Sequence, residues 1–274
     1  GHGASEGAEG GEGTGEGGSE GAAQGAPPVE GGEVEELFAL PLFRKPAFPG
    51  FYHLVQITSP QIFEFIANLQ ASGQGHYLAG FMTTELPAEF ADAPQSETAA
   101  PLVSLPPDSQ PPAAEKKPLR KDTGKVDSVD ELVEVGTKLQ VVSLISQSPN
   151  SPGGSLLVMP TGRIRRVGVA PQEGPSVSPL FKLETVALPN QVVPSASDAK
   201  LSMEIRALHS EMVATMKELL KMPFVNKDQF EQVIRYYSLD DPLKLADLAA
   251  GMSSAPRQDL QEVLTCEDPT ERLR

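Results

Sequence analysis

The sequence predicts an α+β fold in which a β-rich subdomain precedes an α-helical bundle. Between residues 36 and 187, short apolar runs alternate with clusters of Gly, Pro and Ser, a pattern typical of strands and turns. From Asp198 onward, apolar residues recur every three or four positions, as in helices that bury one face. Two segments of low hydrophobicity, at the N-terminus and near residues 86–126, interrupt these patterns.

The N-terminal segment is rich in Gly and Glu. Residues 1–32 contain 13 glycines and six glutamates but no leucine, isoleucine or aromatic residue. Such a segment cannot bury enough apolar surface to offset its ordering entropy, so we predict a disordered tail over residues 1–35. Nine glutamates and no Lys or Arg precede Arg44, so residues 1–43 hold −9 of the formal net charge of −15. This acidic balance argues against a surface that follows nucleic-acid phosphates throughout.

The first folded elements are two strands, a helix and a third strand. Residues 37–43 and 52–57 are apolar and flank a Pro- and Gly-rich connection, which predicts two strands around a stiff loop. Ser59 and Pro60 then supply a helix cap and a first-turn proline. The apolar spacing predicts that this helix ends near residues 72–73 and that a third strand covers residues 76–84.

A Pro-rich segment with a cluster of basic residues follows at about residues 86–126. It contains eight prolines and the cations Lys116, Lys117, Arg120, Lys121 and Lys125. We interpret it as a disordered insert within one subdomain, spanning residues 36–190, because the later strands must join the earlier ones to complete a sheet. Those later strands are expected at residues 137–146, 155–159, 163–169 and 181–187.

The last segment, residues 191–274, predicts a bundle of helices. A long first helix over residues 198–222 carries the apolar stripe Leu201, Ile205, Leu208, Met212, Met216 and Leu219. This stripe is expected in the bundle core, with exposed methionines as the alternative. Shorter helices follow at residues 226–237, 242–251 with Asp241 as cap, and 256–265, and another begins at residues 268–271. A helix start so close to Arg274, and a first residue other than Met, lead us to expect a longer protein.

The sequence contains no recognisable catalytic, cofactor or metal motif. It lacks the phosphate-binding loop Gly-x-x-x-x-Gly-Lys-[Ser/Thr] and a Gly-x-Ser-x-Gly elbow, and Gly13, Gly15 and Gly18 match a dinucleotide fingerprint only within low-complexity sequence. Cys266 is the only cysteine, so no internal disulfide forms, which fits a reducing compartment. The histidines lack metal-ligand spacing, and no apolar run approaches the roughly 20 residues that span a bilayer. The histidines are His2, His53, His76 and His209.

Aromatic residues between positions 43 and 52 are the candidate binding residues. Phe43, Phe48, Phe51 and Tyr52 surround Pro46, Pro49 and Gly50 in a stiff connection. One interpretation is that these rings close the end of the β core. The other is that one or two stay exposed and bind unfolded protein segments, which need apolar surface with little side-chain specificity. Both can hold for different residues.

Several segments resemble the N-terminal domain of Lon proteases. Residues 37–51, with Arg44-Lys45-Pro46 ahead of Phe48-Pro49-Gly50, are similar to the opening strand and loop of the mitochondrial branch. Residues 130–137, 156–167 and 245–273 resemble later segments in the family's order. The resemblance covers about residues 36–85 and 127–274 and implies a PUA-like β subdomain followed by a helical bundle.

The resemblance also implies a function. It implies that the intact protein is a hexameric, ATP- and Mg-dependent serine protease of the mitochondrial matrix. The ATPase and Ser-Lys peptidase machinery of such proteases is absent from this sequence, as is a visible transit peptide. We therefore expect a non-catalytic region that binds misfolded or damaged proteins and contributes to assembly. The alternative is a non-proteolytic adaptor or ligand-binding module, since LON-type domains also occur outside proteases.

Three arginines raise the question of DNA contact, because the family has a reported affinity for mitochondrial DNA. Arg163, Arg165 and Arg166 fall in one predicted strand. Alternation puts Arg163 and Arg165 on one face and Arg166 on the other, so no dense basic patch is formed. The pattern favours a solvated face over a nucleic-acid site.

Overall fold

The computed structural model contains each strand that the sequence predicts. The residues that it describes are 32–50, 52–87, 121–148, 151–171, 178–189, 199–219 and 240–274. Residues 32–274 form one compact unit. The predicted tail over residues 1–31, residues 88–120 of the predicted insert and the predicted helix at residues 226–237 lie outside the described residues.

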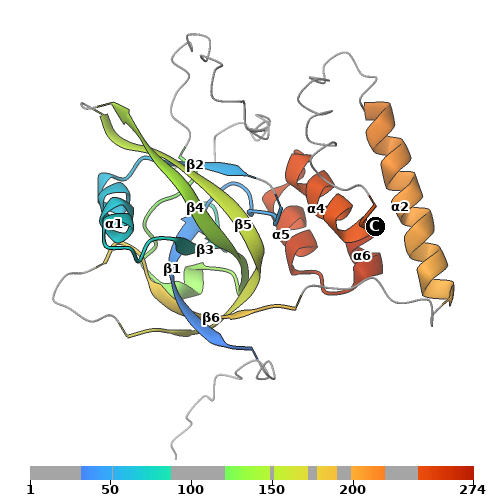
Figure 1. Ribbon diagram of the computed structural model, residues 1–274, viewed down its shortest axis with the longest axis horizontal. Helices are drawn as coiled ribbons and strands as arrows, with labels where there is room; N and C mark the ends of the chain where they lie inside the picture. The colour runs from blue at the N-terminus through green and yellow to red at the C-terminus, as the bar shows by residue number, and fades with distance from the viewer. Residues whose placement is uncertain are drawn as a thin grey trace, which may run out of the picture. The chain divides into compact units, whose positions relative to one another are not determined.

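The strands form a six-stranded mixed sheet that closes on itself (Figure 1). Their order is β2-β5-β4-β3-β1-β6, and β5 also pairs with β6. Five strands therefore form a ring, and β2 extends it along the first half of β5. Only β1 and β3 run parallel. The strands are β1 Val34–Leu42, β2 His53–Ile57, β3 Tyr77–Met82, β4 Val135–Ser148, β5 Ser151–Val169 and β6 Lys182–Ala187.

Strand β5 differs from the prediction because it is one continuous strand of 19 residues. The sequence predicts two strands, at residues 155–159 and 163–169, separated by Pro160, Thr161 and Gly162. In the structure, Leu139 of β4 pairs with Pro160 and Lys138 pairs with Gly162, which leaves Thr161 as an extra residue. This β-bulge absorbs the irregular sequence without ending the strand.

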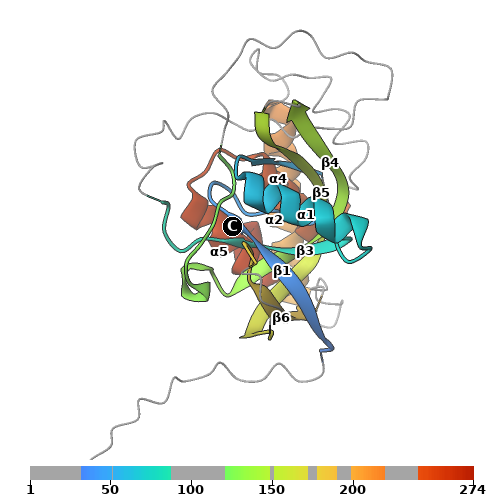
Figure 2. The same ribbon diagram turned by 90° about the vertical axis from the view of Figure 1, so that its left-hand side faces the viewer.

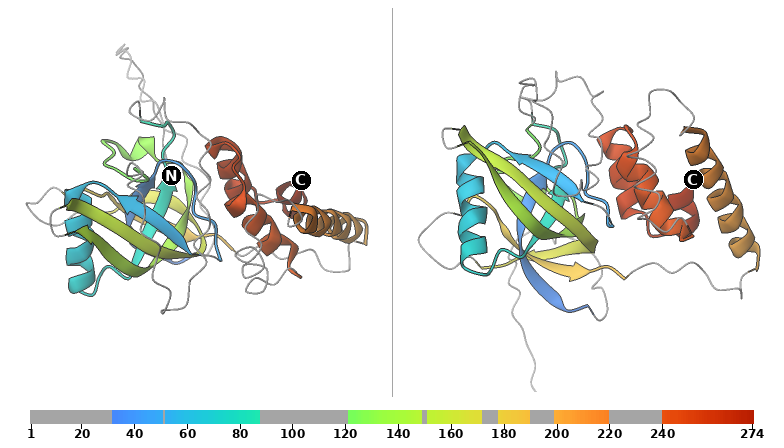
Figure 3. Two further views of the ribbon diagram at one scale, coloured as in Figure 1. Left: turned by 90° about the horizontal axis from the view of Figure 1, so that it is seen from above. Right: turned by 45° about the horizontal axis from the view of Figure 1, so that its top comes forward.

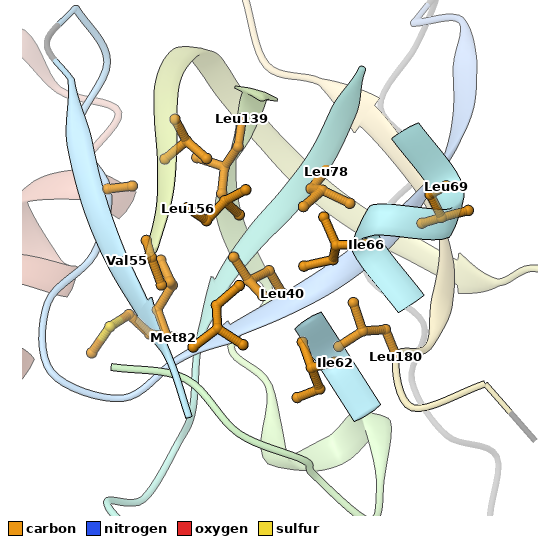
Figure 4. Packing of buried hydrophobic residues seen from close by; sticks show 14 residues of the cluster. Leu40, Val55, Ile62, Ile66, Leu69, Leu78, Met82, Leu139, Leu156 and Leu180 are labelled. Carbon is orange, nitrogen blue, oxygen red and sulfur yellow. The ribbon is translucent and has the colours of Figure 1, made fainter. Parts of the chain in front are cut away.

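The β1–β3 pair buries apolar residues on both faces. One face packs with α1 (Pro60–Ala71), β2 and the β4–β5 hairpin, where Ile62 and Ile66 of the helix meet Leu40 and Leu78 (Figure 4). Ser59 caps this helix as predicted. The other face packs Leu37 and Phe81 against residues from the 126–133 segment, β5 and β6. Figure 2 shows α1 in front of β5, which it contacts.

Residues 121–126, which the sequence assigns to the disordered insert, belong to the described fold. Thr123 forms a bridge with Ile57 of β2, and both Thr123 and Val126 are buried. The Lys- and Pro-rich composition concealed this short contact segment, because only two of its side chains enter the core. Its pairing partner lies in a strand more than 60 residues away, which no local pattern reveals.

The helices after residue 199 lie side by side (Figure 3). The long helix α2 contacts α4 and α6, and Ile205 and Met216 of the predicted stripe are buried there. Asp241 and Asp268 cap α4 and α6, as the sequence predicts. None of the helices within the described ranges is both long and apolar enough to cross a bilayer. The helices are α2 Ala199–Leu219, α4 Pro242–Met252, α5 Arg257–Thr265 and α6 Pro269–Leu273.

Candidate functional site

The aromatic segment between β1 and β2 joins the sheet to the helices. Phe48 is fully buried and packs with apolar residues of α2, α4 and α5, and Phe43 is also buried. Tyr52 is half-buried, and Phe51 lies outside the described residues. In this arrangement Phe43 and Phe48 are packing residues whose rings are buried. A binding role for this segment therefore stays a prediction, and within the described residues Tyr52 is its best candidate.

Lys45 links the same segment to the C-terminal end of α4 by hydrogen bonds. Its Nζ donates to the carbonyl of Gly251 at 2.5 Å and to that of Ser253 at 2.7 Å. These are carbonyls that a helix leaves without intrahelical partners, and the negative end of the helix dipole favours a cation there. Burial lowers the pKa of Lys45 to about 8.

His53 lies at the start of β2, next to this lysine. Its Nε2 is inaccessible to solvent, although part of the residue is exposed. Burial, and to a lesser degree the charge of Lys45, lower the pKa of His53 to about 4. A hydrogen bond with the backbone of Phe48 raises the pKa of His53, but by less. The imidazole is therefore neutral at physiological pH.

We expect His53 to make the fold sensitive to acid. Because its pKa is about 4 in the folded chain and about 6.5 when unfolded, the unfolded chain binds the extra proton first as the pH falls. Stability should therefore decrease between pH 6.5 and pH 4, by about 3 kcal/mol from this residue. Denaturant unfolding of H53Q at several pH values should show a shallower acid loss than wild type. The matched variant H76Q, at an exposed position, should follow wild type, and identical profiles for all three proteins would contradict the assignment.

The predicted basic strand forms an ion pair with the helices. Arg163 donates to both carboxylate oxygens of Asp247, at 3.0 and 2.6 Å, and its Nε donates to the carbonyl of Leu264 at 2.8 Å. Both side chains are largely buried, at 14% and 8% exposure. Arg165 pairs with Glu267 at 2.8 Å, whereas Arg166 donates to the carbonyl of Leu132.

These contacts show that the predicted solvated face of the arginines is wrong. Arg163 and Arg165 do share one face, as predicted, but that face meets the helices instead of solvent. Because Arg163 is engaged with Asp247 and Leu264, it is not presented to nucleic-acid phosphates. Three further hydrogen bonds cross the same junction: Arg257 donates to the carbonyl and to the hydroxyl of Thr83, and Gln261 donates to the carbonyl of Val135 at 2.9 Å.

An apolar surface, which the sequence analysis did not single out, lies on the side of the β4–β5 hairpin turned away from the core. Pairing places Leu54 of β2 beside Leu157 of β5, and Ile145 beside Ser155, with their side chains on this side of the sheet. Val142 and Ile145 are about half exposed, at 47% and 49%. We call the set Leu54, Val142, Ile145, Leu157 and Met159 the outer hairpin face.

The sequence could not separate this face from the core. The two polar residues among positions 139–145, Gln140 and Ser143, are three positions apart, so a period of two does not distinguish the two sides of this strand. The register also shifts between Val141 and Ser143, so Val142 falls in a bulge. Tyr52 comes directly before β2 and is half-buried. Among the described residues no cluster of His, Cys, Asp or Glu could hold a metal ion.

The comparisons with known proteins agree on one family. A profile described as the ATP-dependent protease La (LON) substrate-binding domain matches residues 36–274. The mitochondrial Lon protease homolog of Ostreococcus lucimarinus is 28% identical over 243 residues, which cover 87% of this chain and 25% of that protein. The Lon protease of Chlamydia muridarum is 26% identical over 168 residues, or 52% and 20% of the two chains.

Two solved structures share the fold. The N-terminal domain of a Mycobacterium avium complex Lon protease matches with a TM-score of 0.50 and 19% identity, covering 88% of this chain and 95% of that one. The Lon N-terminal domain protein from Xanthomonas campestris matches with a TM-score of 0.51 and 12% identity, covering 87% and 95%. By contrast, the chain spans about a quarter of the length of the curated relatives that it matches.

Proposed function

Since the chain belongs to the family of Lon (protease La) substrate-binding domains, we propose that it captures unfolded or damaged polypeptides through the outer hairpin face. The observation that carries this proposal is the family match over residues 36–274, which includes the sheet from the third residue of β1 onward and the helices that pack on it. Recognition of unfolded protein requires apolar surface without strict side-chain specificity.

The outer hairpin face meets this requirement better than the buried aromatic rings do. Its apolar side chains come from three paired strands, so the backbone beneath them is held by the sheet. Val142 and Ile145 present about half of their surface to solvent, whereas Phe43 and Phe48 present almost none. Tyr52, which is half-buried directly before β2, stays part of the proposed binding site.

We further propose that the intact protein is an ATP-dependent serine protease of the mitochondrial matrix that assembles as a hexamer. The relatives named mitochondrial Lon protease are about four times longer than the matched region, which leaves room for the ATPase and peptidase parts. ATP and Mg would act there, since the sequence printed here contains no phosphate-binding loop. In this proposal the present chain binds the protein substrate, and the rest of the intact protein cleaves it.

A charge on the outer hairpin face should weaken capture without unfolding the chain. We expect V142D and I145D each to weaken binding of a reduced, carboxymethylated protein by about tenfold, because a carboxylate opposes burial of the apolar contact. The melting temperature should change little, as is usual for exposed positions. Fluorescence anisotropy with a labelled client measures the binding.

The matched control for these variants is V34D. Val34 is 54% exposed on β1, which is not part of the outer hairpin face. Its substitution adds the same charge to an equally exposed valine, so binding should stay within about twofold of wild type. Equal weakening by V34D and V142D would indicate general electrostatic repulsion of the client and would remove the outer hairpin face from the account.

A further inference from the structure

The junction between the sheet and the helices contains little apolar contact. Of the four buried apolar clusters among the described residues, two contain only residues up to Leu183, and one contains only residues of α2, α4 and α6. The fourth joins the two parts, and Phe48 is its only member from outside the helices. Apolar packing is non-directional, so one buried ring holds the helices against the sheet without fixing the angle at which they dock.

Directional contact at this junction comes from polar side chains, and Arg163 of β5 makes the largest share of it. All three nitrogens of its guanidinium are used: two donate to the carboxylate of Asp247 on α4, and Nε donates to the carbonyl of Leu264 on α5. A planar fork that donates two hydrogen bonds to one carboxylate accepts few relative orientations. A single side chain of the sheet is therefore placed to fix the angle of two helices.

Asp247 is an unfavourable residue for its position if stability alone is considered. It lies in the middle of α4, where aspartate has a low helix propensity, and it is only 6% exposed. Taking two charges out of water offsets much of their attraction, so apolar residues of similar volume often give an equally stable fold. What this ion pair adds to an apolar contact is direction.

We propose that Arg163 and Asp247 are positioning residues, whose ion pair selects the one angle at which the helices dock on the sheet. Compared with an apolar pair of similar size, the ion pair contributes orientation and not stability. This inference rests on the proposed function, in which the helices connect the sheet to the rest of the protease. The docking angle then decides where the outer hairpin face points relative to that remainder.

The test replaces the ion pair by apolar residues and measures orientation and stability separately. Nitroxide labels are attached at V34C on β1 and K244C on α4, both exposed positions, in a C266S background that removes the only native thiol. Pulsed electron spin resonance gives the distribution of distances between the labels, which should be one narrow peak with the native pair. In R163M/D247L the distribution should be at least about twice as broad, while the melting temperature stays within about 4 °C of the parent or rises.

Two further variants separate the fork of Arg163 from charge in general. R165M/E267L removes another ion pair that joins β5 to the helical part, but that carboxylate is 68% exposed. Exposed pairs hold their partners loosely, so this variant should keep the width of the peak within about a fifth of the parent value. R163K keeps a positive charge beside Asp247 but lacks the planar fork, so it should broaden the distribution as R163M/D247L does.

Several results would overturn the positioning role. They are an unchanged peak in R163M/D247L, equal broadening in R165M/E267L, and a narrow peak in R163K, since a point charge would then suffice. A melting temperature of R163M/D247L below the stated range would also overturn it, because the pair would then be required for stability.

Client titrations separate this result from the proposed function. The outer hairpin face lies on the sheet, so R163M/D247L should bind a carboxymethylated protein within about twofold of wild type. Failure of wild type to bind that client would overturn the proposed function, whereas the distance distributions, which require no client, would still decide whether the ion pair sets the docking angle.

Discussion

Replacing Phe48 by alanine is expected to lower the free energy of unfolding by about 3–5 kcal/mol, as for other buried aromatic residues. The ring is fully buried and packs against Met216, Leu245 and Leu264, so truncation leaves a cavity where the aromatic segment meets the helices. The same variant should bind an unfolded client normally at temperatures where it remains folded. Urea unfolding followed by circular dichroism measures the first quantity, and client titration measures the second.

Two further variants serve as references for the stability loss of F48A. F48L keeps most of the apolar volume and should cost less than F48A. M203A, at a methionine that is 70% exposed on α2, should change stability by no more than about 0.5 kcal/mol. An F48A variant as stable as M203A would show that Phe48 is not a packing residue, and its predicted role as a binding residue would then return.

Replacing Arg163 by alanine should also cost about 3–5 kcal/mol, because it leaves Asp247 as a buried carboxylate without its main partner. Replacement of Asp247 by alanine should have a similar cost. The double variant should cost much less than the sum of the two, since neither charge then remains buried alone. A complete double-mutant cycle by urea unfolding measures this coupling, and additive losses would contradict the ion pair.

Arg165 supplies the matched control for this cycle. It lies on the same strand and pairs with Glu267, but that carboxylate is 68% exposed. Exposed ion pairs contribute little because solvent screens them, so R165A should cost at most about 1 kcal/mol. If R165A and R163A destabilise the chain equally, loss of positive charge on β5 explains both effects, and the buried geometry does not.

Local signals were sufficient to predict most secondary structure. Ser59 before Pro60, and Asp241 before Pro242, mark helix starts that the structure confirms within a residue. Strand positions follow from short apolar runs bounded by Gly and Pro. These features act within a few residues, so a single sequence is enough to identify them.

Features that depend on distant residues could not be predicted in the same way. The partner of Arg163 is 84 residues away, and nothing near Asp247 distinguishes it from an exposed helix residue. The sequence favoured a core position for the aromatic segment but could not settle it for Phe48, because its neighbours in space belong to helices beyond residue 199. The outer hairpin face depends on the register of β4 and β5, including a bulge at Val142 that no local pattern marks.

The most direct test of the account is whether this chain alone distinguishes unfolded from folded polypeptide. One labelled protein, such as α-lactalbumin, is prepared in its native form and in its reduced, carboxymethylated form, and each is titrated with the chain in the absence of ATP. We expect saturable binding of the unfolded form and at least about thirtyfold weaker binding of the native form, a difference of about 2 kcal/mol. Equal binding of both forms, or of neither, would contradict capture by this chain.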